Sequence, residues 1–145
     1  MHYSVQADHG HFLVEAAGRE ALGRGMKSLA ARFARAVNRA LARKGPVLAG
    51  RYHLRALRSP RQVRNALAYV LLNASRHVAQ RRGRRALRSA AFDPASSARW
   101  FEGWTGRHAG PALGPRSVAV PHTWLLKVGW RRHGLISPSE IPGGG

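Results

Sequence analysis

The chain has 145 residues, with 25 Lys and Arg against 6 Asp and Glu, which gives a formal net charge of +19. Its hydrophobic content of 44% is too high for a disordered tail, so the composition indicates one main folded, strongly basic domain. Because so large an excess of one sign is relieved by a polyanion, nucleic acid is the favoured partner. The sequence contains no cysteine, which excludes disulfide scaffolds, thiolate zinc sites and cysteine nucleophiles.

The N-terminus, which begins Met-His-Tyr, lacks the basic and then apolar layout of a signal peptide. No uncharged apolar run approaches the roughly 18 residues that a membrane-spanning helix needs. We therefore expect a cytoplasmic or nucleoid-associated protein with no membrane partner.

The first half of the chain shows three predicted elements. Residues 3–14 end in an apolar run without a helical stripe, and they predict a strand. From Glu20 to Lys44 apolar residues recur every three or four positions, which predicts a long amphipathic helix that stops at Gly45 and Pro46. Residues 47–57 alternate well enough to predict a second strand.

A second helix is predicted from Pro60 to about Ala79, because Ser59 and Pro60 form a good cap and first-turn pair. Five arginines then fall between Gln80 and Arg88, which indicates a solvated or DNA-facing segment. We expect an α+β domain over 1–88, in which a small antiparallel sheet packs against the two main helices.

The remainder, 89–145, is predicted to be a basic extension that carries all four tryptophans. Thr123 is a candidate cap for a short helix over 124–133, which Gly134 would end. The last five residues, Ile-Pro-Gly-Gly-Gly, are expected to be a disordered tail. Trp100 and Trp104 have the spacing of residues that anchor a helix to a domain, while stacking on bases is the second interpretation.

His9 and His11 are one residue apart, a spacing that puts two side chains on the same face of a strand. Two imidazoles so placed can reach one divalent ion, although a third ligand or waters must complete the site. Taken alone, the pair is more simply explained as two histidines on a half-exposed strand face than as a metal site.

Tyr69 and Asn73 are four residues apart on the second predicted helix, and neither is centred in its apolar stripe. They would project side by side toward a neighbouring surface, either as boundary residues or as parts of a site. If a tyrosine acts as a nucleophile, Tyr69 has a rival in Tyr52, which lies between Arg51 and His53 in the predicted second strand.

Four segments, taken in order, resemble a known family. They are Asp8-His9-Gly10-His11-Phe12-Leu13-Val14, a basic helix with Asn38, Gly50-Arg51-Tyr52-His53, and Ala68-Tyr69-Val70-Leu71-Leu72-Asn73. This arrangement resembles the bacterial REP-associated tyrosine transposases, which belong to the HUH class of single-tyrosine nucleases. The resemblance covers roughly residues 3–80, and it implies a ferredoxin-like HUH nuclease domain.

The resemblance implies an enzyme that cleaves and rejoins single-stranded or hairpin DNA through a 5′-phosphotyrosine intermediate, in DNA transposition or repeat processing. Tyr69 would be the nucleophile. His9 and His11 would hold Mg²⁺ or Mn²⁺, with Asn73 as a third ligand through its carbonyl oxygen. Family members occur as monomers and as dimers, so a homodimer is one of the two expected states.

Basic residues for the DNA phosphates surround the predicted second strand and the tyrosine helix and continue after it. Tyr52 is expected to contact DNA together with them. The predicted contacts are Arg51, Tyr52, Arg55, Arg58, Arg61, Arg64, Arg81, Arg82, Arg84 and Arg85.

The chain also departs from the family pattern. Asp8 and Gly10 stand where relatives usually carry Asn and a bulky residue, and only eight residues precede His9 where relatives begin with a strand and a helix. We therefore expect the N-terminal strand to be missing. The alternative function is that of a truncated or decayed relative that binds nucleic acid without catalysis; a small basic RNA-associated or assembly protein is a more distant alternative.

Overall fold

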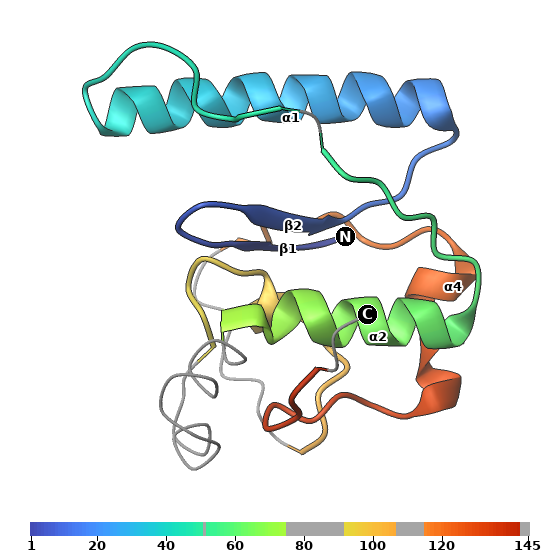
Figure 1. The fold of residues 1–145 in the computed structure, drawn as a ribbon. Helices are drawn as coiled ribbons and strands as arrows, with labels where there is room; N and C mark the ends of the chain where they lie inside the picture. Colours follow the sequence, from blue (N-terminus) through green and yellow to red (C-terminus); the bar gives the residue numbers. More distant parts are fainter. Residues whose placement is uncertain (51, 75–91, 107–114, 143–145) are drawn as a thin grey trace. The chain divides into compact units, whose positions relative to one another are not determined.

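The structure is a computed structural model, which describes residues 1–50, 52–74, 92–106 and 115–142. It is a small α+β fold with a two-stranded antiparallel sheet (Figure 1). The chain divides into two compact units, residues 1–14 with 57–145 and residues 15–56. In chain order the elements are β1 (His2–Val5), β2 (Gly10–Leu13), α1 (Arg19–Ala40), α2 (Pro60–Leu71), the 3-10 turn η2 (Ala98–Trp100), α4 (Trp124–Lys127) and the 3-10 turn η3 (Gly129–His133).

The single strand predicted over 3–14 is a β-hairpin instead. β1 pairs with β2 in antiparallel register, with His2 opposite Leu13 and Val5 opposite Gly10. The chain reverses between the strands, where the backbone N–H of Gln6 donates to the backbone carbonyl of His9 at 2.8 Å. The prediction is wrong here because Asp8-His9-Gly10 carries Asp and Gly, which turns favour, in the middle of the predicted strand.

The second edge of β1 is covered by residues 95–97. Val5 N donates to the Ala95 carbonyl, and Ser97 N donates to the Tyr3 carbonyl, both at 2.9 Å. Ser97 Oγ also accepts from the Tyr3 amide at 2.9 Å. These bonds satisfy the outer backbone groups of β1, which is why buried serines are tolerated at this edge.

Helix α2 begins as predicted, because the Ser59 side chain accepts from the Gln62 amide and Pro60 occupies the first turn. It ends at Leu71, earlier than the predicted end near Ala79, which lies outside the described residues. Its buried face carries Val63, Leu67, Ala68, Val70 and Leu71. This face packs against both strands of the hairpin and against η3.

The core of this unit is built from both ends of the chain. Leu13 of the hairpin and Leu67 of α2 share one cluster with Phe101, Trp104 and Trp130 of the C-terminal part. The predicted boundary between 88 and 89 lies outside the described residues, and residues on both sides of it contribute to this core. The C-terminal segment is therefore an integral part of the hydrophobic core and not an appendage to it.

Two C-terminal predictions are confirmed in part. Thr123 does cap a helix, since its side chain accepts from the Leu126 amide at 3.3 Å, and Gly134 follows the last turn with a φ of +83°. The predicted helix over 124–133 is split at Val128 into α4 and η3. Of the expected disordered tail, Pro142 is buried, while 143–145 lie outside the described residues.

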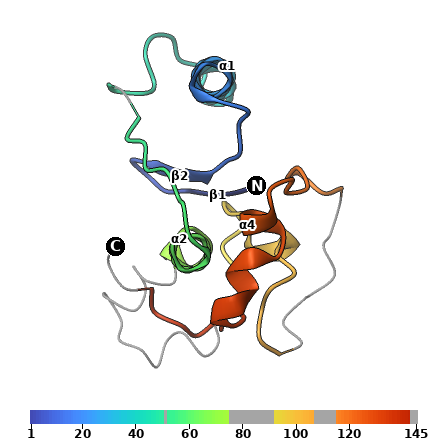
Figure 2. The ribbon, with the colours of Figure 1, turned by 90° about the vertical axis from the view of Figure 1, so that its right-hand side faces the viewer.

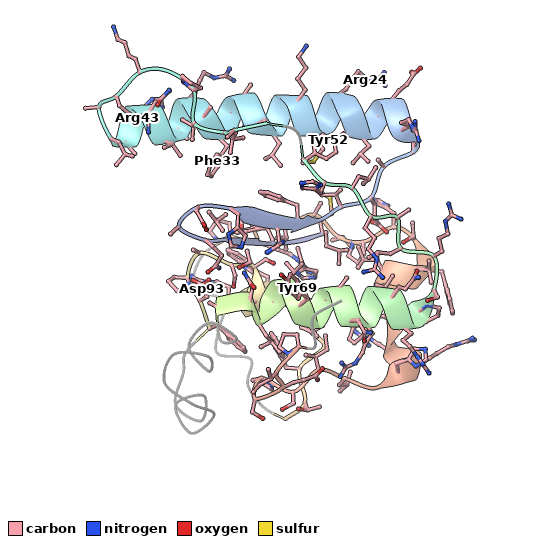
Figure 3. All side chains as sticks on the ribbon, viewed as in Figure 1. Arg24, Phe33, Arg43, Tyr52, Tyr69 and Asp93 are labelled. Atoms are coloured by element: carbon pink, nitrogen blue, oxygen red, sulfur yellow. The ribbon has the colours of Figure 1, made fainter. Side chains whose placement is uncertain are left out.

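The unit of residues 15–56 consists of α1 and a chain segment without regular structure. α1 agrees with the predicted helix but ends at Ala40, where Asn38 Nδ2 donates to the Gly45 carbonyl at 2.8 Å. Arg24 and Phe33 project from different sides of α1 (Figure 3), as expected for an amphipathic helix. The strand predicted over 47–57 is wrong for the described residues, where Leu48, Tyr52 and Leu54 are exposed and no strand forms.

Within the described ranges, no helix combines the length and the apolar character that a membrane crossing requires.

Candidate active site

His9 and His11 lie at the start of β2. His9 is the last residue of the hairpin turn and His11 is the second residue of the strand. Their rings meet edge to face, with centroids 4.9 Å apart and an interplanar angle of 76°. The predicted pairing of the two side chains on one face is therefore what the structure shows, although His9 precedes the strand. The His9 side chain is 43% exposed, so this imidazole lies at the surface.

Asp8 fixes the orientation of the His9 ring. Its Oδ1 lies 2.6 Å from His9 Nδ1, and because an ionised carboxylate can only accept, Nδ1 carries the proton that it donates. In the neutral ring this tautomer leaves the lone pair on Nε2. A carboxylate on one imidazole nitrogen is the arrangement that orients metal-binding histidines in many proteins. Asp8 is 86% exposed, so the pair sits at the surface.

Tyr69 of α2 reaches the histidine pair. The Tyr69 and His11 rings are 4.9 Å apart between centroids and meet at 80°. Figure 3 shows Tyr69 on the side of α2 that faces the hairpin, within the same unit of the fold. The two residues are about sixty positions apart in the sequence. The hairpin and α2 thus bring the predicted nucleophile and the predicted metal-binding histidines into one aromatic cluster.

Asn73 lies just beyond the end of α2. The helix stops at Leu71, and Leu72 has a φ of −107° and a ψ of 12°, so the regular helical spacing from Tyr69 is interrupted. Asn73 is 1% exposed, deeper than the helix pattern indicated. Its Nδ2 is buried and makes no hydrogen bond in the part of the chain that the structure describes. A buried amide group without a partner is costly unless a ligand satisfies it.

A divalent cation at this site would need the two histidines and the Asn73 amide as ligands together. Across residues 1–50, 52–74, 92–106 and 115–142, no group of three His, Cys, Asp or Glu could hold a metal ion by itself. Two imidazoles, His9 and His11, are in contact. The Asn73 amide is a further candidate ligand through its oxygen, and turning it about its Cβ–Cγ bond exchanges Nδ2 for Oδ1. Two imidazoles and one amide oxygen would leave the remaining coordination positions of a divalent ion to water.

Nine of the ten predicted DNA-contacting residues fall into three groups. Arg58 and Arg61 are exposed at the start of α2, in the unit that carries Tyr69. Tyr52 and Arg55 are exposed in the unit of residues 15–56. The others, Arg51, Arg81, Arg82, Arg84 and Arg85, lie outside the described residues.

Arg64 has a partner that sequence reasoning missed. Its Nη1 and Nη2 donate to Glu140 Oε1 and Oε2 at 2.5 and 2.7 Å, and Nη2 also donates to the Leu135 carbonyl at 3.1 Å. The hydrogen bonds from Arg64 lower the pKa of Glu140, while those to Glu140 raise the pKa of Arg64. With both carboxylate oxygens engaged, Arg64 holds the C-terminal segment and is not available to a phosphate. No local signal connects two residues so far apart in sequence.

Comparisons with protein-family models, with curated proteins and with solved structures find no match to this chain.

Proposed function

We propose that this chain is a transposase-like, metal-dependent endonuclease of the REP-associated tyrosine transposase type, which cleaves and rejoins single-stranded DNA. The observation that carries the proposal is the contact of Tyr69 with His11 and of His11 with His9, at 4.9 Å between ring centroids in each case. These three side chains come from the hairpin and from a helix about sixty residues later, and they meet at a partly exposed surface. Their meeting is what single-tyrosine DNA cleavage requires.

In this reaction the Tyr69 hydroxyl oxygen attacks the phosphorus of a DNA phosphodiester. A bond forms between the tyrosine oxygen and phosphorus, the bond from phosphorus to the 3′ oxygen breaks, and the phenol gives up its proton while the leaving 3′ oxygen gains one. The product is a 5′-phosphotyrosine and a free 3′-hydroxyl. Attack of a 3′-hydroxyl on the phosphotyrosine reverses the step and rejoins a strand. Because the phosphodiester of the DNA is exchanged for a phosphotyrosine ester, rejoining the strand needs no nucleotide cofactor.

His9, His11 and Asn73 would hold the divalent cation, with Asp8 fixing the tautomer of His9. When bound, Mg²⁺ or Mn²⁺ stabilises the negative charge that develops on the phosphate oxygens. The chain's own contribution is orientation. The His11 ring holds the Tyr69 ring edge to face, and the rigid α2 backbone fixes the direction of the phenol.

The fold supports the same proposal at a coarser level. An antiparallel hairpin that carries two histidines packs on a helix that carries a tyrosine, which is compatible with part of a ferredoxin-like HUH nuclease domain. The exposed Arg58, which precedes α2, and Arg61 in the first turn of α2 would contact the phosphates of the bound strand.

The alternative function, nucleic-acid binding without catalysis, is favoured by the charge distribution alone. No acidic residue occurs between Glu20 and Asp93, so this whole stretch is basic or neutral. A surface of this kind binds polyanions whether or not the tyrosine reacts. The two functions differ in one outcome, the formation of a covalent bond between protein and DNA.

The test uses end-labelled single-stranded hairpin oligonucleotides of varied sequence, incubated with the full chain and Mg²⁺ or Mn²⁺ and separated on a denaturing gel. We expect a covalent protein–DNA species that requires the metal and is absent for Tyr69→Phe and for His11→Gln. Tyr52→Phe is the matched control and should still form it. If no adduct forms while DNA binding persists, the catalytic proposal fails and the non-catalytic alternative holds.

A further inference from the structure

Trp124 is an exposed aromatic residue on a surface that the proposed reaction does not use. Its exposure is 49%, whereas Trp104 and Trp130 are 6% and 2% exposed. The ring rests on Gly129, where a Cβ atom would lie 2.6 Å from the ring carbon Cζ3. The Arg132 guanidinium carbon lies 4.9 Å from the Trp124 ring centroid. The Trp124 ring therefore packs on Gly129 while about half of its surface stays exposed to solvent as a flat aromatic face.

The surroundings of Trp124 are cationic. Lys127, Arg131 and Arg132 are exposed on α4 and η3, and His133 follows them. No acidic residue occurs between Glu102 and Glu140. Among the described residues, Lys127, Arg131 and Arg132 form no salt bridge with a carboxylate. Three uncompensated charges around one exposed indole are costly in isolation and favour an anionic partner.

This surface belongs to the same unit as the proposed active site. α4 and η3 both pack against α2, and Figures 1 and 2 show α4 beside the N-terminal end of α2. Arg58 and Arg61 are exposed at that beginning. α4, η3 and the start of the tyrosine helix therefore all carry exposed positive charges within one unit of the fold.

We propose that Trp124, Lys127, Arg131 and Arg132, named here the tryptophan–arginine surface, bind single-stranded nucleic acid. One unpaired base would stack on Trp124 or on the Arg132 guanidinium beside it, while the other cations contact the phosphates. Stacking requires a base that is not already paired, so a single strand fits this surface better than a duplex does. The proposal does not depend on cleavage by Tyr69; with cleavage, it assigns the C-terminal segment a role in holding the strand.

An anionic membrane is a less suitable partner. Membrane-surface helices need a long apolar face, whereas α4 has four residues and ends in a turn. The exposed large apolar residues within residues 115–142 are Val120, Trp124, Val128 and Leu135. They offer one aromatic plate and too little apolar area for insertion.

The test measures binding of fluorescein-labelled oligothymidylate by anisotropy, in EDTA and in a Tyr69→Phe background, so that neither metal nor cleavage contributes. We expect Trp124→Leu to weaken binding by roughly 5- to 100-fold and Trp124→Phe to recover part of the loss, since stacking needs an aromatic face. Oligothymidylate should also quench the tryptophan fluorescence of the parent, and the quenching should be absent in Trp124→Phe.

The charge contribution is tested by double variants that remove equal charge. Lys127→Ala with Arg131→Ala should lower the slope of log Kd against log salt by about 1.4, because each phosphate of a single strand that a cation neutralises contributes about 0.7. Arg35→Ala with Arg39→Ala on α1 is the control, and thermal melts show that each variant folds. Equal weakening in the two double variants, or unchanged binding by Trp124→Leu, would overturn the proposal. So would tight binding to phosphatidylglycerol vesicles without binding to oligothymidylate.

Discussion

His2 illustrates how burial decides the chemistry of a single residue in this protein. Its ring meets Phe101 edge to face at 5.3 Å between centroids, and its Nδ1 lies 3.1 Å from Ser97 Oγ. Burial, followed by the nearby N-terminal ammonium group and Arg116, lowers the pKa of His2 from 6.5 to about 3. The folded protein thus keeps this imidazole neutral over a pH range in which the unfolded chain protonates it.

The lowered pKa of His2 predicts acid-sensitive stability. Between pH 6.5 and about 3 the unfolded chain binds one more proton at His2 than the folded chain, so the free energy of unfolding falls as the pH falls, by about 1.4 kcal/mol per pH unit. Urea unfolding at pH 7, 6, 5 and 4 measures this slope. His2→Gln should make this slope smaller by the contribution of one proton, about 1.4 kcal/mol per pH unit. An unchanged slope in His2→Gln would contradict the assignment.

Asp8 is predicted to act on the proposed metal site through His9. Asp8→Ala removes the acceptor from His9 Nδ1 and frees the ring to rotate or change tautomer, so Mn²⁺ binding should weaken by roughly 10- to 100-fold. Asp8→Asn retains an acceptor oxygen and should fall in between. Calorimetric titration of Mn²⁺ into the DNA-free protein gives the readout, with Glu20→Ala on α1 as the charge control. Equal weakening by Asp8→Ala and Glu20→Ala would mean that general charge and not positioning is responsible.

Gly103 is predicted to be essential because it has no side chain. A Cβ atom there would lie 2.2 Å from Trp130 Cη2 and 2.5 Å from Phe101 Cζ, inside the aromatic core. Gly103→Ala should therefore destabilise the fold by about 1–3 kcal/mol or more. Gly25→Ala, where nothing lies within 4 Å of the added carbon, should instead stabilise α1 by about 0.5–1 kcal/mol. Thermal melts of both variants check the pair, and a neutral Gly103→Ala would contradict the packing.

Among the elements, the C-terminal segment is attached to α2 by the Arg64–Glu140 pair. Glu140 has a lowered pKa, so its contribution to stability is present above the unfolded value of 4.5 and is lost as the pH falls through the folded value. Glu140→Gln should destabilise the protein by about 0.5–1.5 kcal/mol, because the pair is partly exposed to solvent. Hydrogen exchange at Leu135–Glu140 should accelerate in Glu140→Gln at pH 7, and unchanged exchange would show that the pair does not hold the segment.

The starts of two helices were predictable because their signals are local. Ser59 and Thr123 both accept hydrogen bonds from the first turn of the helix that follows, as the sequence indicated. The strands were less predictable, since a strand is defined by what it pairs with. The alternation in 47–57 does not form a strand in the described residues, whereas the polar serine segment at 95–97 closes the edge of β1.

The proximity of the candidate site residues was predictable in part. The spacing of His9 and His11 predicts that their side chains share a face, which the structure confirms with contacting rings. The contact between His11 and Tyr69 could not be derived from periodicity, because it depends on α2 packing against the hairpin. Asn73 was expected away from the centre of the helix's apolar stripe. In the structure it lies beyond the end of α2 and is 1% exposed.

For the molecule as a whole, the C-terminal half changes the interpretation most. The sequence predicts an appendage after residue 88, yet Phe101, Trp104, Trp130 and Ile136 form the core together with α2. Aromatic residues set among Pro and Gly have no periodicity that identifies a buried face, so burial could not be derived from their pattern. The positive charge was evident from composition, but its placement around Trp124 needed the fold.

The measurement that tests the central claim most directly locates the covalent bond. After reaction with a hairpin oligonucleotide and Mn²⁺, nuclease and trypsin digestion followed by mass spectrometry separates the three tyrosines, because cleavage after Arg19, Arg51, Arg55, Arg64 and Arg76 places each in its own peptide. The account predicts a nucleotide attached to the peptide of residues 65–76, which contains Tyr69. Attachment to the peptide of residues 52–55, or no attachment while the protein still binds the oligonucleotide, would contradict it.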